Sequence, residues 1–203
     1  MVHTSRASKR AFTLIELLVV IGIIGVTATF GLTSFFRSQE RLKVENAGKE
    51  LVIYLRGVQN RARAGDRGVG GCNDPEEILA RANTFLGWET RITDTAGEIL
   101  FSRAACDDVS GVNSSSRDRG FELSNGLTFS SSPVIDTIFF ESLFGNIKRN
   151  RNPGSPLLEE TRFWITSSQT EYEYYFIIDR GTITNGCLCE GVGCASLATA
   201  PRC

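Results

Sequence analysis

The sequence predicts an α+β protein in which a long N-terminal helix packs on an antiparallel β-sheet head. An apolar run extends from Phe12 to Leu32, and apolar residues then recur at helical spacing from Val44 to Ala62. From about Gly120 the pattern changes to short segments with a period of two, rich in aromatic and β-branched residues. The chain of 203 residues has room for one modest globular domain and one further element.

The composition weighs against two classes of function. The 22 Lys and Arg residues are balanced by 23 Asp and Glu residues, so the chain lacks the basic character of a dedicated nucleic-acid binder. The only histidine is His3, which leaves the rest of the chain without an imidazole for a catalytic base or a zinc site. We therefore expect no enzymatic activity, no cofactor and no metal.

Residues 1–11 form a short basic segment that contains Arg6, Lys9 and Arg10 and no acidic residue. The apolar run that follows, 12–32, is too long for the apolar region of an ordinary secretory signal. As a helix it would rise about 31 Å, close to the ~30 Å hydrocarbon core of a bilayer. We expect 12–32 to span the membrane, with 1–11 on the cytoplasmic side and the rest outside.

Glu16 is the single charge within the apolar run. A carboxylate at this depth costs about 2.5–3.5 kcal/mol on insertion scales unless it finds a partner. One interpretation is that it reaches back to the cytoplasmic headgroups. The other is that it pairs with a cation inside an assembly of helices.

The stretch KRAFTLIELLVVIGIIG resembles the N-terminus of type IV prepilins and type II secretion pseudopilins. This resemblance implies that residues 1–11 are a leader, which a prepilin peptidase removes by cutting between Ala11 and Phe12 before it methylates the Phe12 amine. Prepilins usually have Gly before the cut, where this chain has Ala11. The resemblance also implies that Glu16 neutralises the α-amine of a neighbouring subunit and so sets the register of assembly.

The same resemblance implies partners and a location. The partners are prepilin peptidase, other pilins or pseudopilins, and an inner-membrane assembly platform. The location is the bacterial inner membrane, as a single-pass protein with its head outside, and then a periplasmic or cell-surface fibre.

Residues 33–64 are expected to form the amphipathic half of the same helix. Its stripe is spaced by three or four residues and consists of Val44, Ala47, Leu51, Leu55, Val58 and Ala62. No proline interrupts the chain from Phe12 to Ala64, and Gly65-Asp66 offers a place for the helix to end.

The head is expected to occupy 65–203. A long connection at 66–118 is predicted to contain a short helix at 75–83, a strand near 98–102 and a mobile tip at 114–116. The antiparallel strands then follow within 121–130, 134–142, 161–168 and 171–183, with Tyr172, Tyr174, Phe176 and Ile178 on the face that packs on the helix. The order of these strands loosely resembles the heads of H-type minor pseudopilins and minor pilins.

Six cysteines predict an oxidising compartment. We expect them to be disulfide staples, with Cys72 paired to Cys106 and the others paired among themselves in a tail without strand or helix periodicity. Zinc is the competing interpretation, but the spacing of the tail cysteines is not that of a zinc ribbon or finger. The tail cysteines are Cys187, Cys189, Cys194 and Cys203.

Lys148, Arg149 and Arg151 form the strongest basic cluster after the leader, on a loop that contains proline and glycine. A solvated loop is the default expectation, and a contact with the DNA backbone is the alternative.

The function predicted from these observations is a structural subunit of a type IV pilus-like fibre, a minor pilin. The first alternative is an H-type minor pseudopilin of a type II secretion system. The second is a DNA-uptake or adhesion module at a pilus tip.

Overall fold

The computed structural model describes residues 13–68, 84–95, 98–107, 114–117, 120–150 and 155–191, without the side chains of 29–33, 84, 93–95, 98–99, 107 and 114–117. One long helix, α1 (Leu14–Ala64), precedes a set of antiparallel strands, which confirms the α+β class. The chain divides into two compact units, Met1–Gln39 and Glu40–Cys203. The first part of α1 belongs to one unit and the second part to the other.

The helix ends where the sequence predicts. Gly65 has a φ of 67°, in the left-handed region that favours glycine. The Gly65 N–H donates to Ala62 O at 3.1 Å and the Asp66 N–H donates to Arg61 O at 3.0 Å. This pair of bonds is a Schellman cap, which satisfies carbonyls that the last helical turn would otherwise leave unpaired.

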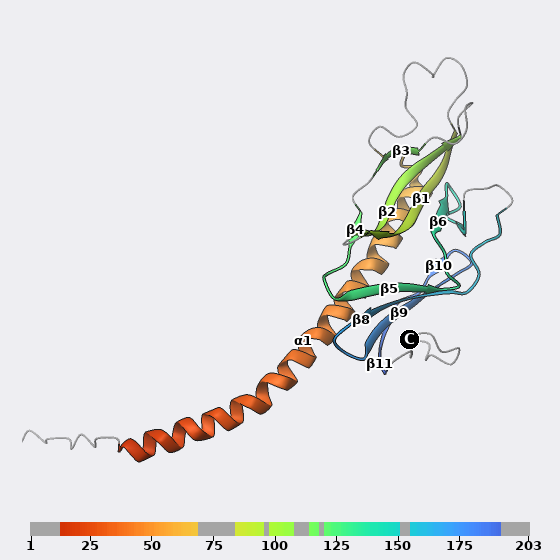
Figure 1. The fold of residues 1–203 in the computed structure, drawn as a ribbon. Coiled ribbons are helices and arrows are strands. Elements are labelled where there is room, and N and C mark those ends of the chain that lie inside the picture. Colours follow the sequence, from red (N-terminus) through yellow and green to blue (C-terminus); the bar gives the residue numbers. More distant parts are fainter. Residues whose placement is uncertain are drawn as a thin grey trace, which may run out of the picture. The chain divides into compact units, whose positions relative to one another are not determined.

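The strands of Glu40–Cys203 form two antiparallel sheets, where the sequence predicted one (Figure 1). The first sheet contains β1 (Thr84–Thr95), β2 (Glu98–Asp107), β3 (Ser114–Arg117), β4 (Phe121–Glu122), β6 (Thr137–Glu141) and β7 (Ile147–Lys148). Its order is β3-β2-β1-β6-β7, and β4 also pairs with β2.

The second sheet contains β5 (Leu127–Ser132), β8 (Thr161–Ser167), β9 (Tyr172–Asp179), β10 (Thr182–Ile183) and β11 (Cys187–Glu190). Its order is β10-β9-β8-β5, and β11 pairs with β9. The predicted hairpin between 161–168 and 171–183 is present, since β8 pairs with β9 from Thr161↔Ile178 to Thr166↔Glu173.

The second part of α1 and both sheets share one hydrophobic core. The predicted stripe is confirmed, because all six of its members from Val44 to Ala62 are buried. On β9, Tyr174, Phe176 and Ile178 are buried as predicted, and the ring of Phe176 stacks on that of Phe163 with centroids 5.2 Å apart.

Gly48 sets the closest approach between α1 and β9. A Cβ atom at Gly48 would overlap the ring of Tyr174, which is itself buried. Glycine is therefore required at this position for the helix to lie against the second sheet, although glycine is among the weakest helix formers.

Two predictions about the head are wrong. The stretch 66–118 is not mainly a connection, since it holds β1, β2 and β3, and β3 includes the predicted tip at 114–116. The tail is not without strands either, because β11 pairs with β9 through backbone hydrogen bonds that need no apolar periodicity. The predicted helix at 75–83 lies outside the described residues.

Candidate functional site

The candidate site is the beginning of α1, where the chain has its N-terminal motif. Ala11 and Phe12, the predicted cleavage and methylation residues, lie outside the described residues, so their roles stay predictions. The description begins at Thr13, and the helix begins one residue later at Leu14.

Thr13 and Glu16 cap this helix reciprocally. The Thr13 N–H donates to Glu16 Oε2 at 3.1 Å, and the Glu16 N–H donates to Thr13 Oγ1 at 3.3 Å. The Thr13 hydroxyl also donates to Glu16 Oε2 at 3.0 Å. This arrangement is a capping box, and a negative charge in the first turn is also favoured by the helix dipole.

The sequence prediction for Glu16 missed this role. A Thr followed three residues later by Glu, just before an apolar run, is the sequence pattern of a capping box, and Thr13 and Glu16 have that spacing. Both contacts of the carboxylate use Oε2, and within the described residues Oε1 has no hydrogen-bond partner. The same carboxylate can therefore cap its own helix and accept a hydrogen bond from an external cation.

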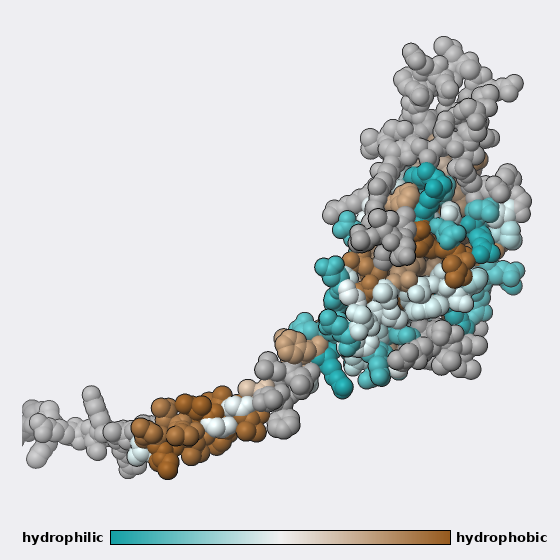
Figure 2. Space-filling view, in the orientation of Figure 1, coloured by the Kyte–Doolittle hydropathy of each residue, from teal (hydrophilic) through white to brown (hydrophobic). Residues whose placement is uncertain are grey.

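The helix that follows this cap exposes apolar side chains along its first turns. Between Leu14 and Val26 the exposure of the large apolar side chains ranges from 43% at Val20 to 79% at Leu14. Figure 2 shows these side chains as a continuous apolar surface on the visible side of the helix. A surface of this kind is typical of a helix that is covered by lipid or by other helices.

A membrane span is not confirmed. Within the part of the chain that the structure describes, no helix is long and apolar enough to cross a membrane. The span at 12–32 accordingly stays a prediction.

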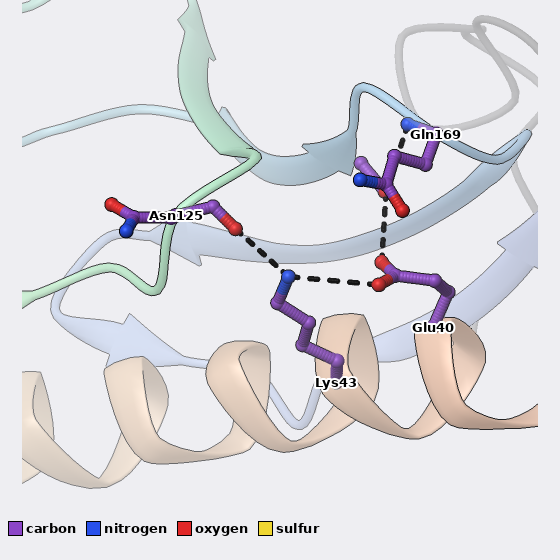
Figure 3. Close-up of polar contacts among 5 residues, drawn as sticks. Glu40, Lys43, Asn125 and Gln169 are labelled. Atoms are coloured by element: carbon purple, nitrogen blue, oxygen red, sulfur yellow. Dashed lines mark hydrogen bonds and ion pairs between the residues drawn. The ribbon is translucent and has the colours of Figure 1, made fainter. Parts of the chain in front are cut away.

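Glu40 and Lys43 fasten α1 to the second sheet at the point where Glu40–Cys203 begins (Figure 3). Lys43 Nζ lies 3.6 Å from Glu40 Oε1 and donates to Asn125 O at 2.8 Å. The Ser167 hydroxyl donates to Glu40 Oε2 at 3.1 Å and accepts a hydrogen bond from the Gln169 N–H. These contacts join one turn of α1 to the turn before β5 and to the end of β8.

The predicted basic loop does not present three free charges. Lys148 lies in β7, and its Nζ lies 2.7 Å from Glu141 Oε1. The Arg149 guanidinium donates to Val134 O at 3.0 Å. Arg151 lies outside the described residues, so a nucleic-acid contact stays a prediction, and the pairing of Lys148 with Glu141 weighs against it.

The described cysteines, Cys106, Cys187 and Cys189, are disulfide-bonded. The connectivity stays a prediction, because Cys72, Cys194 and Cys203 lie outside the described residues.

No group of three His, Cys, Asp or Glu side chains that could hold a metal ion occurs in the described part of the chain.

A buried carboxylate, Glu89, stabilises the first sheet. It lies in β1, where Arg91 Nε approaches its Oε1 to 2.7 Å and Arg103 Nη2, on the neighbouring β2, approaches to 3.2 Å. Burial alone would raise the pKa of Glu89, but the hydrogen bond from Arg91 and the charge of Arg103 outweigh it and lower the pKa below the ordinary 4.5.

The lowered pKa of Glu89 predicts a pH-dependent stability. Since the folded pKa lies below the unfolded one, the carboxylate stabilises the head fully above about pH 4.5 and loses this contribution as the pH falls through the folded pKa. We expect Glu89→Gln to lower the free energy of unfolding at pH 7 and to matter much less near pH 3. Thermal unfolding of both proteins across this range measures the difference, and equal losses at both pH values would contradict it.

The start of the chain matches a known family motif. Residues 6–32 match the prokaryotic N-terminal methylation motif, which is the prepilin cleavage motif of type IV pilins and pseudopilins. Comparison with curated proteins and with solved structures gave no match.

Proposed function

We propose that this chain is a non-enzymatic structural subunit of a type IV pilus-like fibre, a minor pilin. In this proposal prepilin peptidase cuts between Ala11 and Phe12 and methylates the new amine at Phe12. The observation that carries the proposal is the methylation motif at 6–32, which supports a pilin-like or pseudopilin subunit.

In this proposal the exposed apolar surface of α1 is covered first by the membrane and later by other helices of the fibre. Before assembly the subunit lies in the inner membrane, with residues 1–11 cytoplasmic and the head outside. After assembly the same surface packs against the helices of neighbouring subunits in the core of the fibre. Either environment would cover the side chains between Leu14 and Val26, which the isolated chain leaves exposed.

The capping box gives Glu16 a specific part in assembly. Cleavage would create a positively charged amine at Phe12, and burial of that amine in a bundle of helices needs a partner of opposite charge. Glu16 Oε1, which has no hydrogen-bond partner among the described residues, can accept a hydrogen bond from this amine of a neighbouring subunit while Oε2 continues to cap α1. The axial offset between two subunits would then be set by the distance between Phe12 and Glu16 along the helix.

The processing step is tested by the intact mass of the membrane-bound protein. We expect the loss of residues 1–11 and the gain of one methyl group on Phe12. Ala11→Gly, which introduces the residue usual in prepilins, should be processed at least as completely, whereas Ala11→Leu should retain the leader because the bulky side chain would obstruct the peptidase. A wild-type protein that retains its leader, or that is cut near Ser34 and released, would overturn the proposal.

A second candidate is an H-type minor pseudopilin of a type II secretion system, since the matched motif occurs in pseudopilins as well as in pilins. The neighbouring genes distinguish the two candidates. A retraction ATPase and pilus genes favour the pilus, whereas a secretin and further pseudopilin genes favour secretion.

A further inference from the structure

The turn between β6 and β7 has a conformation and an exposure that do not suit its residues. Leu143 has a φ of 65°, a region that few non-glycine residues adopt and in which Asn, Asp and His are enriched. Its side chain and that of Phe144 are each 74% exposed. The turn thus places a leucine where the backbone disfavours it and where packing does not reward it.

The backbone of this turn is firmly held. The Leu143 N–H donates to Ala62 O at 3.3 Å, the carbonyl in the last turn of α1 that also accepts from the Gly65 N–H. The Ser142 N–H donates to Leu86 O at 2.9 Å, and the Gly145 N–H donates to Glu141 O at 3.0 Å. All three bonds are made by backbone atoms. A Gly or Asn at position 143 would therefore keep them, with less strain in the backbone. The leucine side chain is therefore not explained by the fold.

A second strained turn lies beside the first. Arg180, between β9 and β10, has a φ of 45°. Gln59, buried on α1, donates from Nε2 to Gly145 O at 3.0 Å and to Gly181 O at 2.7 Å, and thereby joins a turn of each sheet. The only two non-glycine residues with positive φ among those described, Leu143 and Arg180, thus lie in adjacent turns held by one side chain.

The charges around the two turns are mainly basic. The side chain of Arg63 lies across Gly145, is exposed, and makes no ion pair within the described residues. The side chain of Arg180 is 77% exposed and is 4.0 Å from Asp179 Oδ1, a distance at which an exposed pair contributes little. Glu141 is already bound to Lys148 and Asn146.

We propose that Arg63, Leu143, Phe144 and Arg180 form a docking surface, the double-turn surface, for the head of a neighbouring subunit that offers an apolar socket bordered by carboxylates. Phe and Arg are both enriched in protein interfaces relative to the rest of the surface. Carboxylates on the partner are required because two exposed guanidinium groups flank the apolar pair. A symmetric contact between two copies is disfavoured, since it would bring the same arginines face to face. This inference rests on the proposed function.

The test places a photo-crosslinking amino acid at Phe144 in the full-length chain, in its native host. We expect light to link this position to the head of another subunit of the same fibre. Leu143→Asn should reduce the crosslink about tenfold or more and leave the melting temperature of the head unchanged or raised, because Asn tolerates the left-handed region. Arg180→Glu should have a similar effect on the crosslink, and a Lys at the contacted carboxylate of the partner should restore it.

Val134→Asn is the matched control, because Val134 is 75% exposed but precedes β6, whereas Leu143 follows it. It should leave the crosslink unchanged. The proposal is overturned if Leu143→Asn has no effect, if the crosslink forms only with lipid or with Phe144 of a second copy, or if Leu143→Asn unfolds the head. A Leu143→Asn protein that is processed and enters fibres normally refutes the double-turn surface alone, whereas a chain that keeps residues 1–11 refutes the proposed function.

Discussion

Glu16→Ala is expected to leave a folded, disulfide-bonded head that no longer enters fibres. The substitution removes the two capping contacts of the Glu16 carboxylate with Thr13 and also removes the only charge in the apolar run that could neutralise a buried amine. Removing one partner of a buried ion pair destabilises the structure that contains it by about 3–5 kcal/mol. Applied to the assembled fibre, this loss would lower incorporation of the subunit by more than about a hundredfold. The measurement is the fraction of the chain found in sheared fibres, with the melting temperature of the head as the control for folding.

Two further variants separate the charge of Glu16 from its capping role. Glu16→Gln keeps a side chain that can accept from the Thr13 N–H, since Gln also serves in capping boxes, but it has no charge. Thr13→Ala removes the threonine hydroxyl and keeps the charge, at a cost of about 0.5–2 kcal/mol at the helix terminus. We expect Glu16→Gln to fail as Glu16→Ala does and Thr13→Ala to assemble at a reduced level. Normal assembly of Glu16→Gln would show that the cap alone matters.

The long helix was predictable because its determinants are local. The stripe from Val44 to Ala62 follows the helical period, and Gly65 marks the end of the helix in both sequence and structure. The strands β5, β6, β8 and β9 were likewise predictable, because their segments are rich in aromatic and β-branched residues and have a period near two. Burial on β8, for example, alternates at every residue from Thr161 to Ser167. The short strand β7 was not predicted, because its residues read as part of a loop.

Of the first strands of the head, only the strand near 98–102, which belongs to β2, was predicted, because the interior of these strands is partly polar. On β1 and β2, Thr90 and Ser102 are fully buried, and their hydroxyls lie 2.8 Å apart. The Tyr54 hydroxyl, from α1, lies 2.7 Å from the same Ser102 Oγ. Next to them Glu89 pairs with two arginines. Polar residues that satisfy one another across strands do not produce the apolar alternation by which strands are recognised.

Of the features proposed to act in assembly, one could have been predicted from the sequence and the other could not. The capping box of Thr13 and Glu16 is a local pattern and could have been found in the sequence. The double-turn surface could not, because the positive φ of Leu143 and its proximity to Arg180 depend on Gln59 and on two sheets that meet only in the folded chain.

Gly48→Ala and Gly57→Ala are expected to change the stability of the head in opposite directions. Both residues lie within α1, where alanine is favoured over glycine by up to about 1 kcal/mol. At Gly57, which is exposed, a Cβ would meet nothing within 4 Å, so this gain should be realised. At Gly48 a Cβ would overlap the buried Tyr174 ring, which cannot move without disturbing the core it shares with α1.

Overpacking of this kind costs about 1–3 kcal/mol and can exceed that range. For a protein of this size each kcal/mol moves the melting temperature by about 2–4 °C. We therefore expect Gly57→Ala to melt slightly above the wild type and Gly48→Ala to melt several degrees below it, in thermal unfolding followed by circular dichroism. If both variants melted above the wild type, helix propensity alone would determine the stability at both positions. The conclusion that α1 packs closely on Tyr174 of β9 at Gly48 would then be wrong.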